Sequence, residues 1–352
     1  MTRGHDREVL PLNGAMTSVR QDRLGTYTET LRRFAKWFSR YRRPDGSLDA
    51  PNLSCPAHMP VPLYAHAIGE PGLLHASLAY MEARAARDSH FLLAPGRDLL
   101  SYRMAWITLG AVLGDRLRFA RSLEQQLLAF QDPRSGGFFG TEAACRAGEG
   151  EICLDSTANA CAALCLMGND KAAARAGDFL RRLIQPQIEA GQRLLCGWHS
   201  HHGLITAFEA KQARVYSIEP GERSQYLYKI GLLVRAFAFL YCRTGEDADL
   251  KLSRACQAWA VDRSPDVWSN TLGHKLGWSA WTLFSLTRDR AYLEQSCRVA
   301  DHLTTLQQPD GAFHYPEYWP PYAQVATEWK LNLGCQFATW IAYARTMLQG
   351  DE

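Results

Sequence analysis

The chain has 352 residues, of which 47% are hydrophobic and 11% aromatic, so it can bury a large core. Its formal net charge is only +3, and basic residues are interspersed with acidic ones, which excludes the basic patch typical of nucleic-acid-binding proteins. The sequence also lacks an apolar run of about eighteen residues, so it predicts no membrane span. We therefore expect a small-molecule partner, with no nucleic acid and no membrane.

The N-terminal segment differs from the rest of the chain. Residues 1–20 are polar and do not contain the apolar stretch of a secretion signal, so we predict a flexible arm there and a single domain over residues 21–352. The ten cysteines are scattered and include no CxxC pair, which favours reduced thiols and a cytoplasmic location.

A helical unit of about 45 residues recurs along the chain. Each unit has a helix, a tight polar turn, an amphipathic helix and a longer loop, and the tight turns make the flanking helices antiparallel neighbours. These turns are Gly114-Asp115, Gly168-Asn169-Asp170, Thr244-Gly245-Glu246 and Thr287-Arg288-Asp289. The second helices end alike at 38–51, 127–140 and 303–316, where Pro and Gly stop the helix.

The periodicity predicts an inner and an outer layer of helices. The more uniformly apolar segments are assigned to the inner layer, in chain order 71–86, 102–113, 156–167, 226–242, 274–286 and 328–346. Segments with a polar face, such as 171–185 and 290–307, are assigned to the outer layer. The first helix lacks a preceding partner and the last lacks a following one, so we predict that they pair. The predicted fold is all-α, a closed ring of six helical hairpins, with strand-like alternation only in short loops such as 193–206.

The longer connections all lead from an outer helix to the next inner one, so they share one end of the ring. They are 42–70, 132–155, 186–225, 261–273 and 308–327. That end also receives the N-termini of the inner helices, whose free N–H groups favour anions. We therefore expect the active site at this end.

Four inner helices begin with a similar pair of residues: Tyr102-Arg103, Tyr228-Lys229, His274-Lys275 and Trp329-Lys330. A basic residue is unfavourable at a helix N-terminus, so its repetition predicts an acidic partner or a bound anion. The alternative is that these lysines point outward or pair with residues of neighbouring helices, without contacting a ligand. As substrate contacts we name Arg103, Lys229, Lys275 and Lys330.

Two carboxylates stand at the starts of inner helices, Asp155 on the third and Glu328 on the last. Each is a candidate for proton transfer, and helix N-capping is the alternative explanation.

Histidines gather in the predicted loops. The stretch 196–203 contains His199, His201 and His202, and His314 lies in a later loop. Metal binding by the first three is the alternative to acid–base use, but no HExxH or cysteine-containing zinc spacing is present, so we predict no metal and no cofactor. His199 and His201 are candidate acid–base groups, whereas His202 and His314 are candidate substrate contacts.

Aromatic residues are concentrated at the same end. Tyr228, Trp278, Tyr318 and Trp319 are candidate walls of a pocket. Such rings stack on a sugar, shield a carbocation, or simply pack the interior.

The repeat resembles that of the six-hairpin, (α/α)6-barrel superfamily. The stretch 273–281, followed by Ala291-Tyr292-Leu293, is similar to the Gly-His-containing inner helix of N-acylglucosamine 2-epimerase-type sugar isomerases, which implies an acid–base role for His274. The stretch 154–159 is similar to the catalytic-aspartate helix of unsaturated uronyl hydrolases, which implies a catalytic Asp155. The Gln-Pro-Asp-Gly loops resemble those of terpenoid-cyclase and prenyltransferase toroids.

These observations give a leading hypothesis and two alternatives. The leading one is a cofactor-independent acid–base enzyme, an isomerase, lyase or hydrolase, acting on a small polar or anionic substrate such as a sugar or sugar acid. The first alternative is a cyclase or dehydratase of a terpenoid or polyketide-like skeleton, and the second is a non-catalytic binding ring. A homodimer is compatible with each of them.

Overall fold

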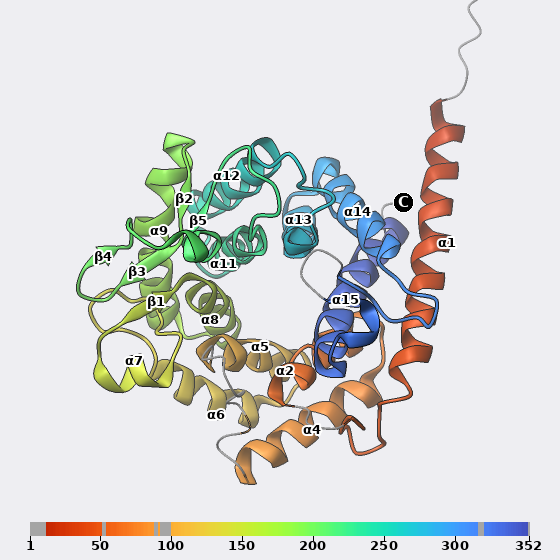
Figure 1. Ribbon diagram of the computed structural model, residues 1–352, viewed down its shortest axis with the longest axis horizontal. Helices are drawn as coiled ribbons and strands as arrows, with labels where there is room; N and C mark the ends of the chain where they lie inside the picture. Colours follow the sequence, from red (N-terminus) through yellow and green to blue (C-terminus); the bar gives the residue numbers. More distant parts are fainter. Residues whose placement is uncertain (1–11, 51–53, 88–90, 92–99, 316–319, 351–352) are drawn as a thin grey trace, which may run out of the picture.

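The computed structural model of the chain describes residues 12–50, 54–87, 91, 100–315 and 320–350, and most of these residues are helical (Figure 1). The helices form two concentric layers around a common centre. Within the described part of the chain, none of the helices combines the length and the apolar character needed to cross a membrane. All ten cysteines are free thiols, and most of them are buried in the core.

Six helices form a closed inner ring. Each packs against the next one along the ring, and the last of them returns to the first. In ring order these are α3 (Val61–Ala67), α5 (Leu100–Leu113), α8 (Leu154–Met167), α11 (Tyr228–Thr244), α13 (His274–Thr287) and α15 (Thr327–Gly350). They are buried nearly all round because the ring interior covers one side and the outer layer covers the other.

Each inner helix has an outer partner that runs beside it. The partners of α3, α5, α8, α11, α13 and α15 are α4 (Pro71–Arg87), α6 (Leu117–Leu128), α9 (Asp170–Ala190), α12 (Asp247–Arg263), α14 (Arg290–Thr305) and α1 (Leu12–Phe38). The predicted ring of six hairpins is therefore confirmed, including the pairing of the last helix with the first.

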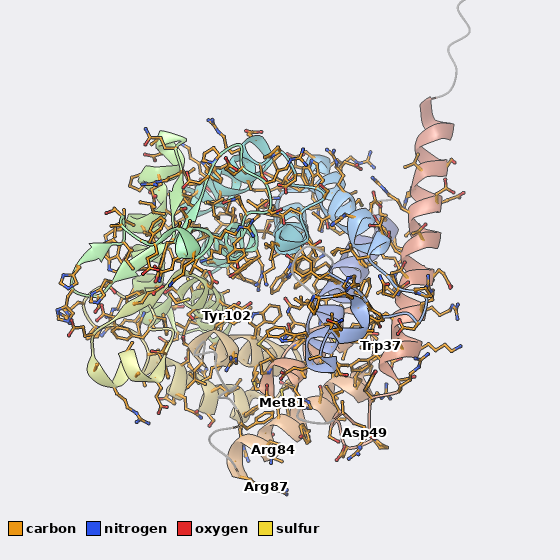
Figure 2. All side chains as sticks on the ribbon, viewed as in Figure 1. Trp37, Asp49, Met81, Arg84, Arg87 and Tyr102 are labelled. Carbon is orange, nitrogen blue, oxygen red and sulfur yellow. The ribbon has the colours of Figure 1, made fainter. Side chains whose placement is uncertain are left out.

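One predicted inner helix, 71–86, was assigned to the wrong layer. It corresponds to α4, which buries a single stripe that includes Leu74, Leu78 and Met81 and exposes its other face at the outside of the ring (Figure 2). The inner position belongs to α3, which follows the short helix α2 (Cys55–His58) within the predicted loop 42–70. The N-terminal arm also needs correction, because residues 12–20 belong to α1. Residues 1–11 lie outside the described residues.

The four predicted tight turns are confirmed as the connections between inner and outer helices. At each turn the chain reverses through one residue with a positive φ. These residues are Asp115, Gly168, Gly245 and Arg288. Each connection has only two or three residues, so each hairpin is fixed locally.

The Gly-containing loops at the ends of three outer helices join neighbouring hairpins. Gly46, Gly136 and Gly311 have positive φ, and a Cβ on each would lie between 2.1 and 2.4 Å from a backbone oxygen of the next outer helix. Two of the loops contain an equivalent glutamine contact. The side-chain amide of Gln131 donates to the carbonyls of Gly136 (3.0 Å) and Ala172 (2.9 Å), and that of Gln307 donates to Gly311 (3.0 Å) and Thr30 (2.9 Å). The repeated sequence therefore encodes a repeated contact, and at Gly311 this contact closes the ring against α1.

Substituting Gly311 by alanine tests this contact. The new methyl group would lie 2.4 Å from the Arg33 carbonyl oxygen, in addition to the strain of a left-handed alanine. We expect Gly69→Ala, which also has a positive φ (73°, against 100° at Gly311) but nothing within 4 Å, to lower the free energy of unfolding by about 1 kcal/mol. Gly311→Ala should lose a further ~1–3 kcal/mol in urea denaturation. Equal losses in the two variants would show that the close approach is unimportant.

The long loops carry the few strands, all at the predicted end of the ring. One antiparallel sheet has the order β1-β3-β4, and a second pairs β2 with β5. Their bounds are β1 Glu151–Cys153, β2 Leu194–Leu195, β3 Gly197–His199, β4 Gly203–Leu204 and β5 Ser217–Ile218. The predicted strand-like stretch 193–206 is confirmed. Short helices in the loops are α7 (Glu142–Ala147), α10 (Ala213–Tyr216), η2 (Ala210–Gln212), η3 (Thr271–Gly273) and η4 (Tyr322–Gln324).

Candidate functional site

Asp155 is a buried carboxylate at the loop end of the inner ring. Strand β1 runs directly into α8, and Asp155 lies in the first turn of that helix, whose N-cap residue is Cys153. It therefore does not cap the helix. Its Oδ2 accepts a hydrogen bond from the Tyr228 hydroxyl at 2.8 Å, whereas its buried Oδ1 accepts none. A buried carboxylate oxygen without a hydrogen bond is unusual in a folded protein, so this oxygen is a candidate acceptor for a substrate.

Helix α11 supplies the neighbours of Asp155. The Lys229 ammonium lies 3.6 Å from Asp155 Oδ1 and donates to the Val215 carbonyl at 2.7 Å. Burial alone would lower the pKa of Lys229, but the negative groups around it, of which Asp155 contributes most, together outweigh burial and hold the pKa above the ordinary value. Burial and the same carboxylate raise the pKa of the Tyr228 phenol well above its usual range. At neutral pH Lys229 is therefore a cation and Tyr228 a neutral donor.

Helix α13 begins with a second titratable pair, His274 and Lys275. His274 Nδ1 lies 2.8 Å from the Thr271 carbonyl, to which it can only donate, so Nε2 is left to accept a hydrogen bond from the Lys275 amine at 3.2 Å. Burial, together with the charge of Lys275, lowers the pKa of His274 to about 3. The imidazole is therefore neutral and positions Lys275.

Lys275 is the group at the centre of this end that titrates near neutrality. Its Nζ lies 4.9 Å from the centre of the Tyr228 ring and 5.8 Å from that of Trp106. Burial lowers its pKa to about 7, against the opposing effect of the Asp155 carboxylate, and the positive charge of Arg235 lowers it further. Both protonation states are accessible at neutral pH, which suits a proton-transfer group.

Helix α15 supplies two more polar side chains at this end. The amide oxygen of Gln336 lies 3.3 Å from His274 Nε2, but in this tautomer both atoms are acceptors and no hydrogen bond joins them. The Gln336 nitrogen donates to Asn332 at 2.9 Å. Asn332 in turn donates to the carbonyl of Pro56 on α2. Polar side chains from α8, α11, α13 and α15 thus form an arc around one end of the ring.

Aromatic side chains lie one or more turns deeper in the inner helices. The Trp278 and Trp340 rings stack with centroids 4.3 Å apart, and Trp106 lies 5.4 Å from Trp278. Tyr102, one turn before Trp106 on α5, lies toward the centre of the ring in Figure 2. The three indoles come from three different inner helices, so they fill part of the interior behind the polar arc.

Arg235 is a buried cation within this aromatic layer, and the sequence analysis did not identify it. Its guanidinium stacks on Trp278, and its Nε and Nη1 make no hydrogen bond. Only 1% of the residue is exposed, and burial lowers the pKa of Arg235 well below its ordinary value. The available signal was a single arginine in the otherwise apolar run of 230–240.

No family model and no curated protein matches this sequence. Solved structures do match over nearly the whole chain. The GH76 α-1,6-mannanase from Salegentibacter sp. HEL1_6 superposes with a TM-score of 0.65, at 14% identity over 92% of this chain and 99% of that chain. The fold is an (α/α)6 barrel.

Two further similar structures show how varied this barrel is. The GH76 α-mannanase BT2949 from Bacteroides thetaiotaomicron has a TM-score of 0.61, at 12% identity over 93% of this chain and 97% of that chain. A variant of the type II terpene cyclase MstE from Scytonema has a TM-score of 0.59, at 14% identity over 93% and 99%. At such identities the likeness establishes the fold alone. The sugar-isomerase resemblance of 273–281 stays a prediction.

Three other charged residues that the sequence suggested as site residues, Arg103, Glu328 and Lys330, have different surroundings. Arg103 is buried on α5, where its charge opposes the burial that raises the pKa of Cys55 to about 12. Glu328 is half-buried and accepts hydrogen bonds from the backbone and hydroxyl of Ser54. Lys330 is also half-buried, with its ammonium 3.9 Å from the Tyr322 ring. The structure thus brings together Asp155, Tyr228, Lys229, His274 and Lys275, whereas Lys330 lies elsewhere in contact with Tyr322.

The loop histidines are distributed differently from the barrel residues. His199, His201 and His202 lie in the β3–β4 hairpin, and within the described ranges no contact joins them to Asp155 or Lys275. His314 packs edge-on against Tyr322 at 5.7 Å. Their acid–base and binding roles remain predictions. Tyr318 and Trp319 lie outside the described residues.

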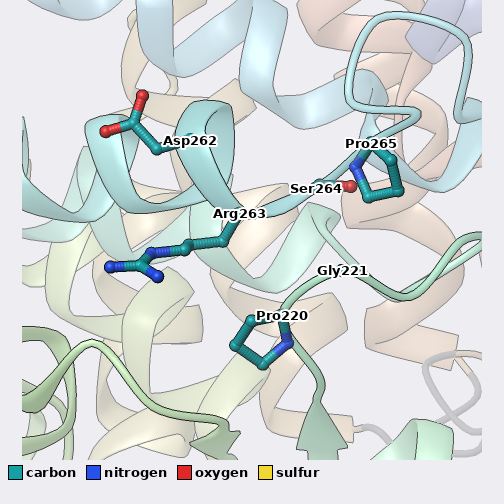
Figure 3. Close-up of a pocket in the computed structure, with 6 residues that line it drawn as sticks. All are labelled: Pro220, Gly221, Asp262, Arg263, Ser264 and Pro265. Carbon is teal, nitrogen blue, oxygen red and sulfur yellow. The ribbon is translucent and has the colours of Figure 1, made fainter.

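A surface hollow of about 430 Å³ lies at the C-terminal end of α12 (Figure 3). Its lining is Pro220, Gly221, Asp262, Arg263, Ser264 and Pro265. None of these residues belongs to the polar arc, and Gly221 is tied to Arg263 by a backbone hydrogen bond of 2.7 Å. We assign it no part in the site.

Proposed function

We propose that this barrel is an enzyme that transfers protons on a small anionic substrate held at the loop end of the inner ring. One observation carries the proposal. Among the described residues of the inner helices, Asp155 is the only buried carboxylate, whereas several buried side chains are basic. Lys229 pairs with Asp155, and the described residues give Arg235 and Lys275 no carboxylate partner. An excess of buried positive charge is costly without a counter-charge, and an anionic substrate supplies it.

The proposed chemistry uses two groups of the arc, Lys275 and Asp155. Lys275, held by His274, removes a proton from the substrate as the free amine and returns it as the ammonium. Asp155 Oδ1 accepts a hydrogen bond from a substrate hydroxyl, while Tyr228 and Lys229 keep the carboxylate in place. The positive charges nearby stabilise the negative charge that develops when the proton leaves.

This arrangement favours an isomerase or lyase over a hydrolase. Glycoside hydrolysis ordinarily requires two carboxyl groups on either side of the scissile bond. Here the second carboxylate named from the sequence, Glu328, is engaged by Ser54. A substrate with a carboxylate and several hydroxyl groups, such as a sugar acid, matches the cations, the acceptor oxygen and the aromatic rings together.

The experiment uses hexuronates and aldonates, with the corresponding neutral sugars as controls. We expect the acids, and not the neutral sugars, to raise the melting temperature, because only they neutralise the buried cations. In D2O, NMR should show deuterium entering the carbon next to the carboxylate or carbonyl. This exchange should fall at least about 100-fold in Lys275→Met and persist in Lys251→Met, which alters an exposed lysine on α12. Equal stabilisation by neutral sugars, or exchange at the normal rate in Lys275→Met, would contradict the proposal.

A second candidate, a cyclase, is favoured by the cluster of Trp106, Trp278 and Trp340 behind the polar arc that contains Asp155. Aromatic faces stabilise carbocations, and one carboxylic acid suffices to protonate an alkene. Incubation with polyprenyl phenols followed by mass spectrometry tests it. A cyclic product that requires Asp155 but not Lys275 would select this reaction over the first.

A further inference from the structure

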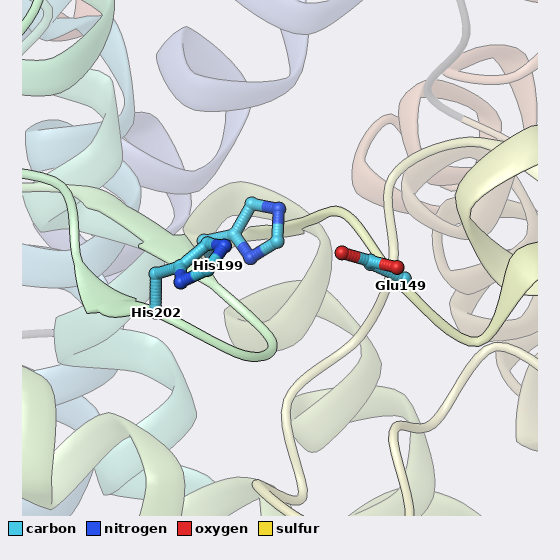
Figure 4. Close-up of side chains that lie close together, drawn as sticks. All are labelled: Glu149, His199 and His202. Carbon is cyan, nitrogen blue, oxygen red and sulfur yellow. The ribbon is translucent and has the colours of Figure 1, made fainter.

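A second cluster of chemistry-bearing side chains lies on the loops, apart from the polar arc. Glu149, His199 and His202 each offer one ligand atom, and these atoms all lie within 4.8 Å of one another (Figure 4). The two imidazole rings are 4.6 Å apart between centroids and tilted by 34°. We infer that these three residues bind a divalent transition-metal ion of the zinc class.

The backbone brings the three residues together from two distant segments. Glu149 lies two residues before Glu151, where β1 begins, and His199 ends β3. These strands pair so that Glu151 lies opposite His199. The turn that carries His202 is fastened to the same place, because Ser200 N–H donates to the Gly150 carbonyl at 2.9 Å. Gly150 N–H donates back to the Ser200 hydroxyl at 3.1 Å. The cluster is therefore set by sheet register and not by chance approach of long side chains.

The donor set fits zinc better than calcium or magnesium. Two imidazoles and one carboxylate are ligands of Zn²⁺ and its neighbours, whereas Ca²⁺ and Mg²⁺ prefer oxygen alone. Bonds of about 2.1 Å place tetrahedral ligand atoms roughly 3.4 Å apart, so small side-chain rotations suffice to close the site. Glu149 and His202 are exposed and His199 is half-buried, which gives the ion access and leaves a coordination position for water.

The third histidine of the hairpin is excluded from this set by its own partner. His201 Nε2 accepts a hydrogen bond from the Arg134 guanidinium at 2.6 Å, and that guanidinium also reaches the Gly148 carbonyl at 3.3 Å. A nearby positive charge disfavours a metal ion at this ring. His201 is therefore a matched control within the same turn.

The bound ion would act on the barrel through β1. It would clamp the segment before β1 to the β3–β4 turn, and β1 runs into the first turn of α8. The inference does not depend on the proposed function, since a metal at this hairpin stabilises the loop end whatever reaction occurs there.

The test is a titration of untagged, metal-free protein with Co²⁺, a spectroscopic substitute for Zn²⁺. We expect the visible bands of a four- or five-coordinate site at one equivalent, and a rise in melting temperature with Zn²⁺. His199→Gln, His202→Gln and Glu149→Gln should each weaken binding by more than about tenfold, and His201→Gln should bind as the unaltered protein does. Circular dichroism of each variant checks its fold. Absence of the bands, their persistence in His202→Gln, or their equal loss in His201→Gln would overturn the assignment.

Discussion

Replacing Asp155 by alanine is expected to lower the free energy of unfolding by about 3–5 kcal/mol, because it leaves the Lys229 cation buried without its counter-charge. The pair is almost fully enclosed, with side-chain exposures of 7% for Lys229 and 8% for Asp155. Among the described residues, the Lys229 ammonium donates a hydrogen bond to the Val215 carbonyl, which carries no net charge. Urea denaturation of the single variant measures the loss.

Two controls separate this electrostatic loss from other effects. The double variant Asp155→Ala, Lys229→Met should recover most of the stability, because it removes the stranded charge together with its partner. Glu29→Ala breaks an exposed ion pair with Arg32 on α1 and should leave stability almost unchanged. If the double variant were as unstable as Asp155→Ala, packing and not charge would explain the loss.

Replacing Lys275 by methionine is expected to have the opposite effect and to stabilise the protein by up to about 4 kcal/mol at pH 7. Burial lowers the pKa of Lys275 from 10.5 to about 7, so the folded chain binds fewer protons than the unfolded chain between these values. Stability therefore rises with pH across this window. The cost of the buried amine is fully present below pH ~7 and disappears above pH ~10.5.

The measurement is the free energy of unfolding against pH for the unaltered protein, Lys275→Met and Lys251→Met. Lys275→Met should be the most stable near pH 7, and its advantage should shrink as the pH approaches 10. Lys251→Met should follow the unaltered protein throughout, because Lys251 is exposed on α12. An advantage independent of pH would indicate better packing by methionine. If Lys275→Met is both more stable and unable to catalyse deuterium exchange, the native lysine is maintained at a cost in stability.

Most of the fold could be predicted from the sequence because the contacts that define it are local. Apolar helices, left-handed turns and the Gly-containing loops recur, and each repeat fixes contacts only with its neighbours. Five predicted inner helices are confirmed as α5, α8, α11, α13 and α15. The exception was the first inner position. There Pro56, Pro60 and Pro62 break the chain into the short helices α2 and α3, which look like a loop in the sequence.

The site could be predicted only in outline. The repeat placed Lys229, Lys275 and Lys330 at equivalent helix positions, but their partners differ. Lys229 lies beside a carboxylate, Lys275 beside a neutral histidine and Lys330 beside a tyrosine ring. Those partners come from other helices and loops, so helical periodicity cannot reveal them. Arg235 was missed for the same reason, since its neighbours Trp278, Tyr102 and Tyr343 lie on three other inner helices.

The most direct test of a proton-transfer lysine in the barrel is a pH titration of the lysine side chains by ¹³C NMR. The chain has only seven lysines, and Lys275→Met identifies the signal of interest. We predict one midpoint near pH 7, absent from Lys275→Met, that moves to higher pH when a hexuronate binds and favours the protonated amine. If every lysine titrates near the ordinary pKa of about 10.4, with and without the anion, Lys275 is not the proton-transfer group and the proposed site is wrong.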